Sequence, residues 1–479
     1  MIGSLGPRAY SDLVVAMIVL PLSVGIALMV TILVKPDLGL VAWLFLVGAV
    51  AAPVAIRLAQ RRFDVFEPVV LASLVYFGIF VVPCGIMLFF GYTYPLLPSA
   101  DLSGGAIVVG LGVLCFAAGY LLVVPHPLEW RRDRRTPAAQ WAPRLLVWAI
   151  VSGLSAISLL TYVLFFFPSA GGLSQYLDPG AGFLTSVDTL RGAGVARAAI
   201  LIGSVGFFIA VLHLLLHSSP RRSDVLLVFL SGTASVVTTA LSKNRVFLLW
   251  DLAVPIVLLH YSRRPIRAAE AVLGTTVLFV IVVAFTVAIR SPAAFTSRTD
   301  NGLFADIADF LVVQTGEMSV VSDITQRQPV TLGYLNGATL AASAVNIVPR
   351  ELWPEKPATA GEIYTRYFMP DVWRTGTTFL GVPWQGELLL NGGMTALVVG
   401  TFVSGMLCGV VYRRIWAASS ALSIALRGLV AFSLYLLITR GSLQFDSFTL
   451  VWGVPLVLGT LAIVKYGVRR GNLRSPLDA

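Results

Sequence analysis

The chain has 479 residues, a formal net charge of +10 and a mean hydropathy of +0.86. Hydrophobic residues make up 57% of it and charged residues only 12%. This excludes a soluble protein, because soluble domains could not bury so many apolar side chains. Apolar runs of about 18–24 residues recur along the whole length, and each can cross a hydrocarbon core of ~30 Å. The composition therefore predicts an all-α, polytopic membrane protein.

Twelve apolar runs are predicted to be transmembrane helices. They cover residues 10–34, 38–56, 67–90, 104–124, 144–167, 197–217, 224–241, 246–261, 270–289, 394–412, 420–438 and 447–465. Basic residues gather in the connections that follow even-numbered spans, as in the arginines at 131–135. Such connections are cytoplasmic by the positive-inside rule, so both termini are predicted to be cytoplasmic. No basic run is interleaved with stacking aromatic residues, so the positive charge does not indicate nucleic-acid binding.

Neither cysteine nor histidine indicates a metal or cofactor site. The three cysteines all fall within apolar spans, which is typical of small buried side chains and gives no disulfide framework. His213 and His217 have a metal-compatible i,i+4 spacing, but no nearby Cys or carboxylate completes a ligand set. In the predicted topology all four histidines lie toward the cytoplasm. Acid–base chemistry on the outer face would therefore depend on Asp or Glu.

One long polar interruption divides the chain into three parts. Residues 1–289 contain spans one to nine, residues 290–385 form a large extracytoplasmic loop, and residues 386–479 contain a broken helix and spans ten to twelve. Within the loop, helical spacing predicts an amphipathic helix over 303–321. Residues 349–357 form a proline-rich strap, because each residue that precedes a proline is pushed to an extended conformation. A loop of this length usually carries function.

Two carboxylates in this region are candidate catalytic bases. Glu387 and Asn391 are four residues apart and share a helical face, and Gly392-Gly393 interrupts the helix before the next full span. A broken helix within a bundle is tolerated only where it lines protein or a water-filled cavity, and a carboxylate there is a functional candidate. Glu317, on the predicted loop helix, is the second candidate. Its alternative is an interfacial helix with a solvated acidic side.

Six cations are candidates for binding an anionic ligand. Four lie at the outer ends of spans and two lie on the strap: Lys243, Arg245, Arg290, Arg440, Arg350 and Lys356. Guanidinium groups bind phosphate oxygens in a bidentate manner, so such a group would suit a multiply anionic ligand. The alternative is that each side chain extends to lipid phosphates, as helix-end arginines commonly do. Asp251, in the outer half of the eighth span, is predicted to pair with one of these cations.

The order of several motifs resembles a known family. These motifs are Leu241-Ser242-Lys243-Asn244-Arg245, Pro349-Arg350 with Trp353-Pro354 and Lys356-Pro357, Gly386-Glu387 with Asn391-Gly392-Gly393, and Thr439-Arg440-Gly441. Together they look like the bacterial Wzy-type O-antigen or oligosaccharide repeat-unit polymerases. The similarity covers residues 242–446, and the strap is its most specific element. The first half matches only as generic apolar helices.

The resemblance implies a GT-C-like membrane glycosyltransferase of the bacterial inner membrane, with an active site that faces outward. It would polymerise polyprenyl-pyrophosphate-linked oligosaccharide repeat units, with the lipid bilayer as its environment and a chain-length regulator and a flippase as candidate partners. The leaving pyrophosphate needs cations, and the acceptor hydroxyl needs a base. The resemblance therefore assigns pyrophosphate or substrate binding to the six cations and catalysis to Glu387 or Glu317. No metal or other cofactor is expected.

Two alternatives stay open. An O-antigen ligase would share the helical scaffold and the cationic outer side, but that family places a histidine in its large outer loop and this chain has none there. A transporter or flippase of lipid-linked sugars would be expected to show inverted repeats with matched broken helices. The sequence shows one Gly-interrupted segment without a counterpart in its first half.

Overall fold

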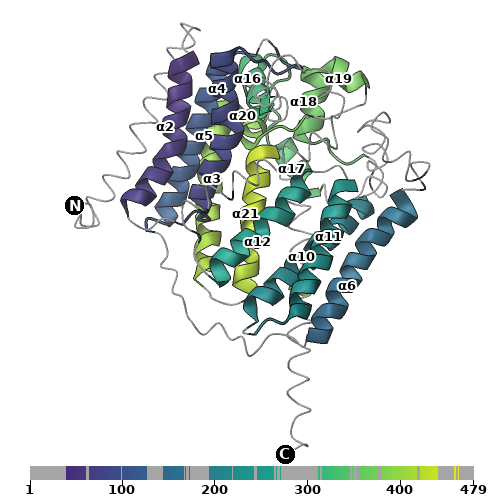
Figure 1. The fold of residues 1–479 in the computed structure, drawn as a ribbon. Helices are drawn as coiled ribbons and strands as arrows, with labels where there is room; N and C mark the ends of the chain where they lie inside the picture. Colours follow the sequence, from purple (N-terminus) through teal and green to yellow (C-terminus); the bar gives the residue numbers. More distant parts are fainter. Residues whose placement is uncertain are drawn as a thin grey trace, which may run out of the picture.

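The structure, a computed structural model (Figure 1), describes the helical body of the chain. The described residues are 39–60, 64–98, 100–126, 144–166, 194–217, 219–241, 245–263, 316–345, 355–375, 380–417 and 421–440, with isolated residues between and after these ranges. Three predicted spans, 10–34, 270–289 and 447–465, fall largely or wholly outside them.

Every described element is helical, which confirms the all-α prediction within these residues. The longer helices are α2 (Gly39–Ala59), α3 (Pro68–Tyr76), α4 (Val82–Phe90), α5 (Leu102–Val123), α6 (Arg144–Thr161), α10 (Gly194–Leu216), α11 (Arg222–Leu241), α12 (Arg245–Ser262), α20 (Trp384–Trp416) and α21 (Ala421–Arg440). A π-helical segment, Phe77–Val81, joins α3 to α4, and another, Tyr162–Phe166, extends α6. Of the nine remaining predicted spans, eight each coincide with one of these helices, and the span 67–90 covers α3, the first π-helical segment and α4.

Five continuous helical stretches among the described residues are long and apolar enough to cross a membrane. They are Gly39–Ala59, Pro68–Phe90, Leu102–Val123, Arg144–Leu164 and Trp384–Trp416. Shorter apolar stretches occur in α10, α12 and α21. Since several such helices lie in one chain, the structure supports a multi-pass membrane protein.

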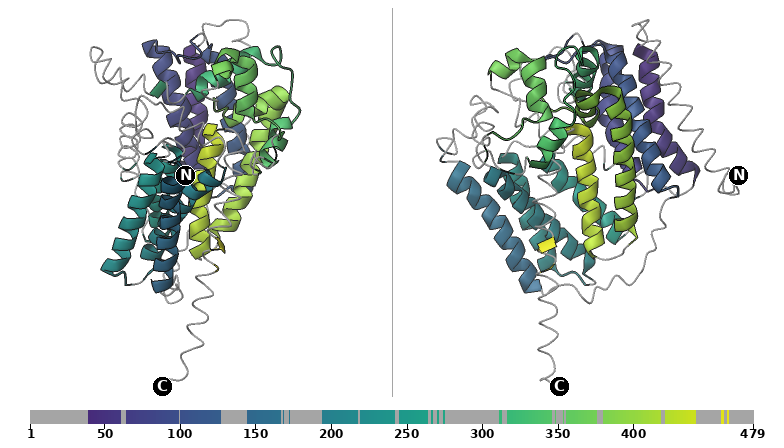
Figure 2. Two further views of the ribbon diagram at one scale, coloured as in Figure 1. Left: turned by 90° about the vertical axis from the view of Figure 1, so that its right-hand side faces the viewer. Right: turned by 180° about the vertical axis from the view of Figure 1, so that it is seen from behind.

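The helices form two groups that share α5, α20 and α21 (Figures 1 and 2). One hydrophobic core joins α2, α4, α5 and α16 (Glu317–Arg327) with the first part of α20, and the other joins α6, α10, α12 and α21. Nearly every residue of α5 is buried, and α5 packs directly along α20. A Cβ added at Gly119 would overlap the carbonyl oxygen of Phe402, and one at Gly405 would overlap that of Phe116. Small residues therefore let the two backbones touch.

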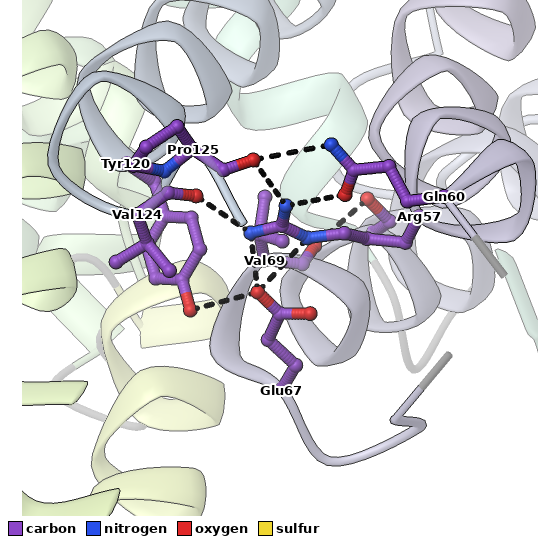
Figure 3. Close-up of polar contacts among 8 residues, drawn as sticks. Arg57, Gln60, Glu67, Val69, Tyr120, Val124 and Pro125 are labelled. Atoms are coloured by element: carbon purple, nitrogen blue, oxygen red, sulfur yellow. Dashed lines mark hydrogen bonds and ion pairs between the residues drawn. The ribbon is translucent and has the colours of Figure 1, made fainter. Parts of the chain in front are cut away.

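A buried ion pair ties α2, α3 and α5 together at the end opposite α16 (Figure 3). Arg57 and Glu67 are both fully buried, and Glu67 Oε1 accepts from Arg57 Nη2 at 2.6 Å and from Tyr120 Oη at 3.1 Å. Arg57 also donates to the carbonyl oxygens of Val124 and Pro125, at the end of α5. Arg57 is thus an internal clamp for the end of α5, which the basic-cluster pattern did not indicate.

The long polar segment contains more helix than predicted. It holds α16, α17 (Ala338–Val345), α18 (Ala360–Phe368) and α19 (Pro370–Thr375). The predicted helix 303–321 overlaps the start of α16, while residues 303–310 lie outside the described residues. α16 ends before Gln328, which is extended because Pro329 follows it. α18 begins with a capping box, in which Thr359 Oγ1 and the Glu362 carboxylate each accept from the other's backbone N–H. α16, α18 and α19 stand at one end of the bundle, and α17 lies below them (Figure 1).

Candidate functional site

The break in α20 is the centre of the candidate site. Residues 384–391 form one helical piece, and the helix resumes after Gly392 and Gly393, whose backbone angles are not helical. Gly393 has φ 63°, a region that favours glycine, and a Cβ there would lie 2.7 Å from Tyr334 Oη. Two independent constraints therefore require glycine at this position. The interruption predicted from the sequence is present.

A loop of the polar segment donates hydrogen bonds to the last carbonyl groups of the first helical piece. The backbone N–H of Leu335 donates to the carbonyl oxygen of Leu390 at 2.9 Å, and that of Asn336 donates to the carbonyl oxygen of Asn391 at 2.8 Å. These carbonyl groups would otherwise lack partners, since the helix stops there. The loop turns through positive φ at Gly333, Asn336 and Gly337. It is therefore shaped to lie against the break.

Glu387 is fully buried one helical turn before the break. Neither of its carboxylate oxygens has a hydrogen-bond partner among the described residues. Thr339, in the first turn of α17, lies close enough to influence the carboxylate, and its Oγ1 accepts from Asn391 Nδ2 at 2.6 Å. Asn391 Nδ2 also donates to the Glu387 carbonyl oxygen at 2.7 Å. The predicted shared face of Glu387 and Asn391 is thus observed, with a carboxylate whose charge has no local compensation.

A cavity of about 470 Å³ lies on the other side of the same loop. Its wall combines apolar, aromatic and charged side chains from the loop, the strap, α18 and α19. These are Leu332, Leu335, Lys356, Ala358, Glu362, Ile363, Arg366, Tyr367 and Trp373. Leu335 belongs to both features, because its backbone bonds to the helix break and its side chain lines the cavity. One loop therefore separates Glu387 from the cavity.

The cavity has a net positive lining. Lys356 Nζ donates to the Val348 carbonyl oxygen at 3.0 Å, and the Arg366 guanidinium lies 5.6 Å from the ring centre of the exposed Tyr367. The Glu362 carboxylate is engaged by the capping box of α18. Two cations and one committed carboxylate suit an anionic ligand, and Tyr367 and Trp373 add flat apolar surfaces.

A polar cluster fixes α18 to α16 and so fixes the cavity wall. Asp323 Oδ2 accepts from Tyr364 Oη at 2.7 Å and from Arg327 Nη2 at 2.5 Å. Arg327 also donates to the Phe368 carbonyl oxygen at 2.8 Å and lies over the Phe368 ring. Burial, together with the Asp323 carboxylate, raises the pKa of Tyr364, which therefore remains a neutral hydrogen-bond donor.

Glu317, the second predicted base, lies elsewhere on α16. It is the first residue of that helix and is 6% exposed. Its neighbour Gly316 contacts Tyr94, whereas α16 approaches Gly386 through Ile324. Seven residues of α-helix rise about 10 Å, so Glu317 lies about that far along α16 from the contact with α20. The geometry therefore favours Glu387 over Glu317 as the acid at the helix break.

The structure describes only some of the six predicted cations. Lys356 lines the cavity. Arg245 is the first residue of α12 and Arg440 the last of α21, but their side chains lie outside the described part of the structure, as do Lys243, Arg290 and Arg350 entirely. Sequence reasoning missed Arg366 and Trp373. The Thr359-Ala360-Gly361-Glu362 pattern was the available signal, since it marks the start of the helix that carries Arg366.

Comparison with known proteins gives one match. A family model described as a domain of unknown function, DUF8712, matches residues 276–453. The matched region includes the whole polar segment from α16 to α19, the break in α20 and α21. No curated protein and no solved structure matches the chain.

Proposed function

We propose that this chain is a membrane glycosyltransferase that polymerises polyprenyl-pyrophosphate-linked oligosaccharide repeat units on the outer face of a bacterial inner membrane. The observation that carries this proposal is Glu387, a buried carboxylate without an ion-pair partner among the described residues, on a broken helix whose capping loop also lines a cationic and aromatic cavity. In its full form the proposal includes twelve spans, a GT-C-like arrangement and both termini in the cytoplasm.

In the proposed reaction Glu387 acts as the base, and the cations of the cavity stabilise the leaving group. The acceptor hydroxyl gives its proton to Glu387 as its oxygen bonds to the anomeric carbon of the donor glycan. The bond from that carbon to the pyrophosphate oxygen breaks, and the electron pair leaves with the lipid pyrophosphate. Lys356 and Arg366 stabilise this negative charge, and Tyr367 and Trp373 contact the faces of sugar rings. The loop from Gly333 to Gly337 shifts to admit the acceptor to Glu387.

Burial of the base suits this chemistry. A desolvated carboxylate has no competing hydrogen bonds, so it can accept a proton from a hydroxyl that enters the site. A long loop that caps the break keeps water away until substrate is bound, which limits hydrolysis of the donor. The separate cationic cavity holds the diphosphate apart from the base.

The test is polymerisation by the purified protein in lipid nanodiscs, supplied with lipid-linked repeat units and no nucleotide sugar. We expect wild-type protein to make longer glycans, resolved by gel electrophoresis and mass spectrometry. Glu387→Gln should abolish elongation. Arg366→Gln should reduce it about 10–100-fold, because one of the cations that stabilise the leaving pyrophosphate is lost. Asp371→Asn is the control, since that side chain on α19 is 92% exposed. Normal elongation by Glu387→Gln would refute the site.

A lipid-linked sugar transporter is the second candidate. Broken helices commonly form transporter substrate sites, and α20 is such a helix. The same nanodiscs distinguish the two functions. If wild-type protein moves the lipid-linked unit between leaflets and its glycans never lengthen, transport replaces glycosyl transfer as the function.

A further inference from the structure

A second buried carboxylate, Asp251, lies among hydroxyl groups from two other helices. Its Oδ2 accepts from Ser235 Oγ at 2.8 Å and from Thr239 Oγ1 at 3.1 Å, both on α11. Ser235 Oγ lies 3.1 Å from Ser204 Oγ on α10. Asp251 is 1% exposed and the three hydroxyl residues are fully buried. The span-end cations predicted to pair with Asp251 have side chains outside the described residues, and the described partners of its carboxylate are hydroxyl groups.

The second oxygen of this carboxylate has no partner. Asp251 Oδ1 is buried and makes no hydrogen bond in the described structure. The polar seam continues beyond the cluster, because Gly203 leaves room for the hydroxyl of Ser158 on α6. Ser158 Oγ is also buried without a hydrogen-bond partner. Two unsatisfied oxygens thus lie along one hydroxyl-rich seam in an apolar helix bundle, where such groups are costly.

The charge of the cluster determines the class of ligand. One carboxylate contributes a single negative charge, and the hydroxyl residues contribute none. A divalent ion would leave a net positive charge buried among apolar helices, at a large desolvation cost. A monovalent cation makes the cluster neutral. Oxygen ligands of this kind suit a hard cation.

The hydrogen bonds favour a metal ion over a proton. A proton would neutralise Asp251 without using the lone pairs on the neighbouring hydroxyl oxygens. A bound ion needs only lone pairs. Ser235 Oγ lies within hydrogen-bond distance of both Asp251 Oδ2 and Ser204 Oγ. Because a hydroxyl has one proton and an ionised carboxylate can only accept, we infer that Ser235 donates to Asp251, and both serine oxygens then keep lone pairs.

We propose that Asp251, Ser204, Ser235 and Thr239 form a buried sodium-binding site that joins α10, α11 and α12. Asp251 supplies the charge through its carboxylate, and the hydroxyl oxygens complete the ligand set. The ion neutralises the carboxylate and links three helices that already pack together. This site is separate from the helix break and does not depend on the proposed glycosyl transfer.

The first experiment measures binding of radioactive ²²Na⁺ to purified wild-type protein. We expect saturable binding that unlabelled NaCl displaces and that KCl or choline chloride at equal ionic strength does not. The unfolding midpoint should rise with NaCl concentration and reach a plateau, because the ion binds the folded state. Absence of saturable ²²Na⁺ binding overturns the proposal.

Variants locate the site. Asp251→Asn should abolish both ²²Na⁺ binding and the sodium-dependent rise in the midpoint. Ser235→Ala, which removes one ligand and keeps the charge, should need about tenfold more Na⁺ for half-saturation. Asp371→Asn should bind as wild type does. If binding survives in both the Asp251 and Ser235 variants, the ion lies elsewhere. A midpoint that follows pH through Asp251 but ignores Na⁺ assigns the site to a proton and overturns the sodium proposal.

Discussion

Replacement of Glu387 by glutamine separates catalysis from structure, because this carboxylate has no ion pair to lose among the described residues. Both carboxylate oxygens of Glu387 are buried without a partner. Burial of an ionised carboxylate costs several kcal/mol, whereas burial of an unpartnered amide costs about 1–3 kcal/mol. We therefore expect Glu387→Gln to raise the free energy of unfolding by about 1–3 kcal/mol while elongation stops. A side chain that serves packing alone would not combine these effects.

The matched control is Glu67, which like Glu387 is fully buried. One of its oxygens accepts from Arg57 and from Tyr120. Glu67→Gln should therefore lower the free energy of unfolding by about 3–5 kcal/mol, because it leaves the buried arginine without its counter-charge. Unfolding of the detergent-solubilised variants is followed by the fluorescence of the ten tryptophans, and elongation is measured in parallel. A Glu387→Gln protein as destabilised as Glu67→Gln would show that Glu387 is a structural residue and refute the reasoning.

Three further predictions concern the scaffold. Gly119→Val should cost more than about 3 kcal/mol of unfolding free energy, because its Cβ would overlap the α20 backbone; Gly153→Ala, which faces open space, should leave the unfolding midpoint within a degree or two. Gly393→Ala should cost about 1–3 kcal/mol through its positive φ and the contact with Tyr334, and a wild-type midpoint would show that the break tolerates a side chain. Thr359→Ala should cost about 1 kcal/mol and loosen α18, measured as faster amide hydrogen exchange across 360–368; unchanged exchange would argue against the capping box.

The helical scaffold could be predicted from the sequence because a membrane leaves few choices. A backbone in hydrocarbon must satisfy its own hydrogen bonds, so each long apolar run becomes a helix. The break in α20 was predictable for the same local reason, since two consecutive glycines weaken a helix where they stand. The capping box of α18 could also be predicted, because its pattern lies within four adjacent residues.

The partners of the charged groups could not be predicted in this way, because they lie far away in the chain. Arg57 belongs by sequence to a basic cluster, yet it pairs with Glu67 and clamps the end of α5. Asp251 accepts hydrogen bonds from serine and threonine hydroxyl groups that its own stretch of sequence did not indicate. The apolar runs determined where the long helices form. Only tertiary packing decided which charges are paired, which are bridged by hydroxyl groups and which, like Glu387, are buried alone, because the energy of a buried charge depends on distances between helices that no local pattern encodes.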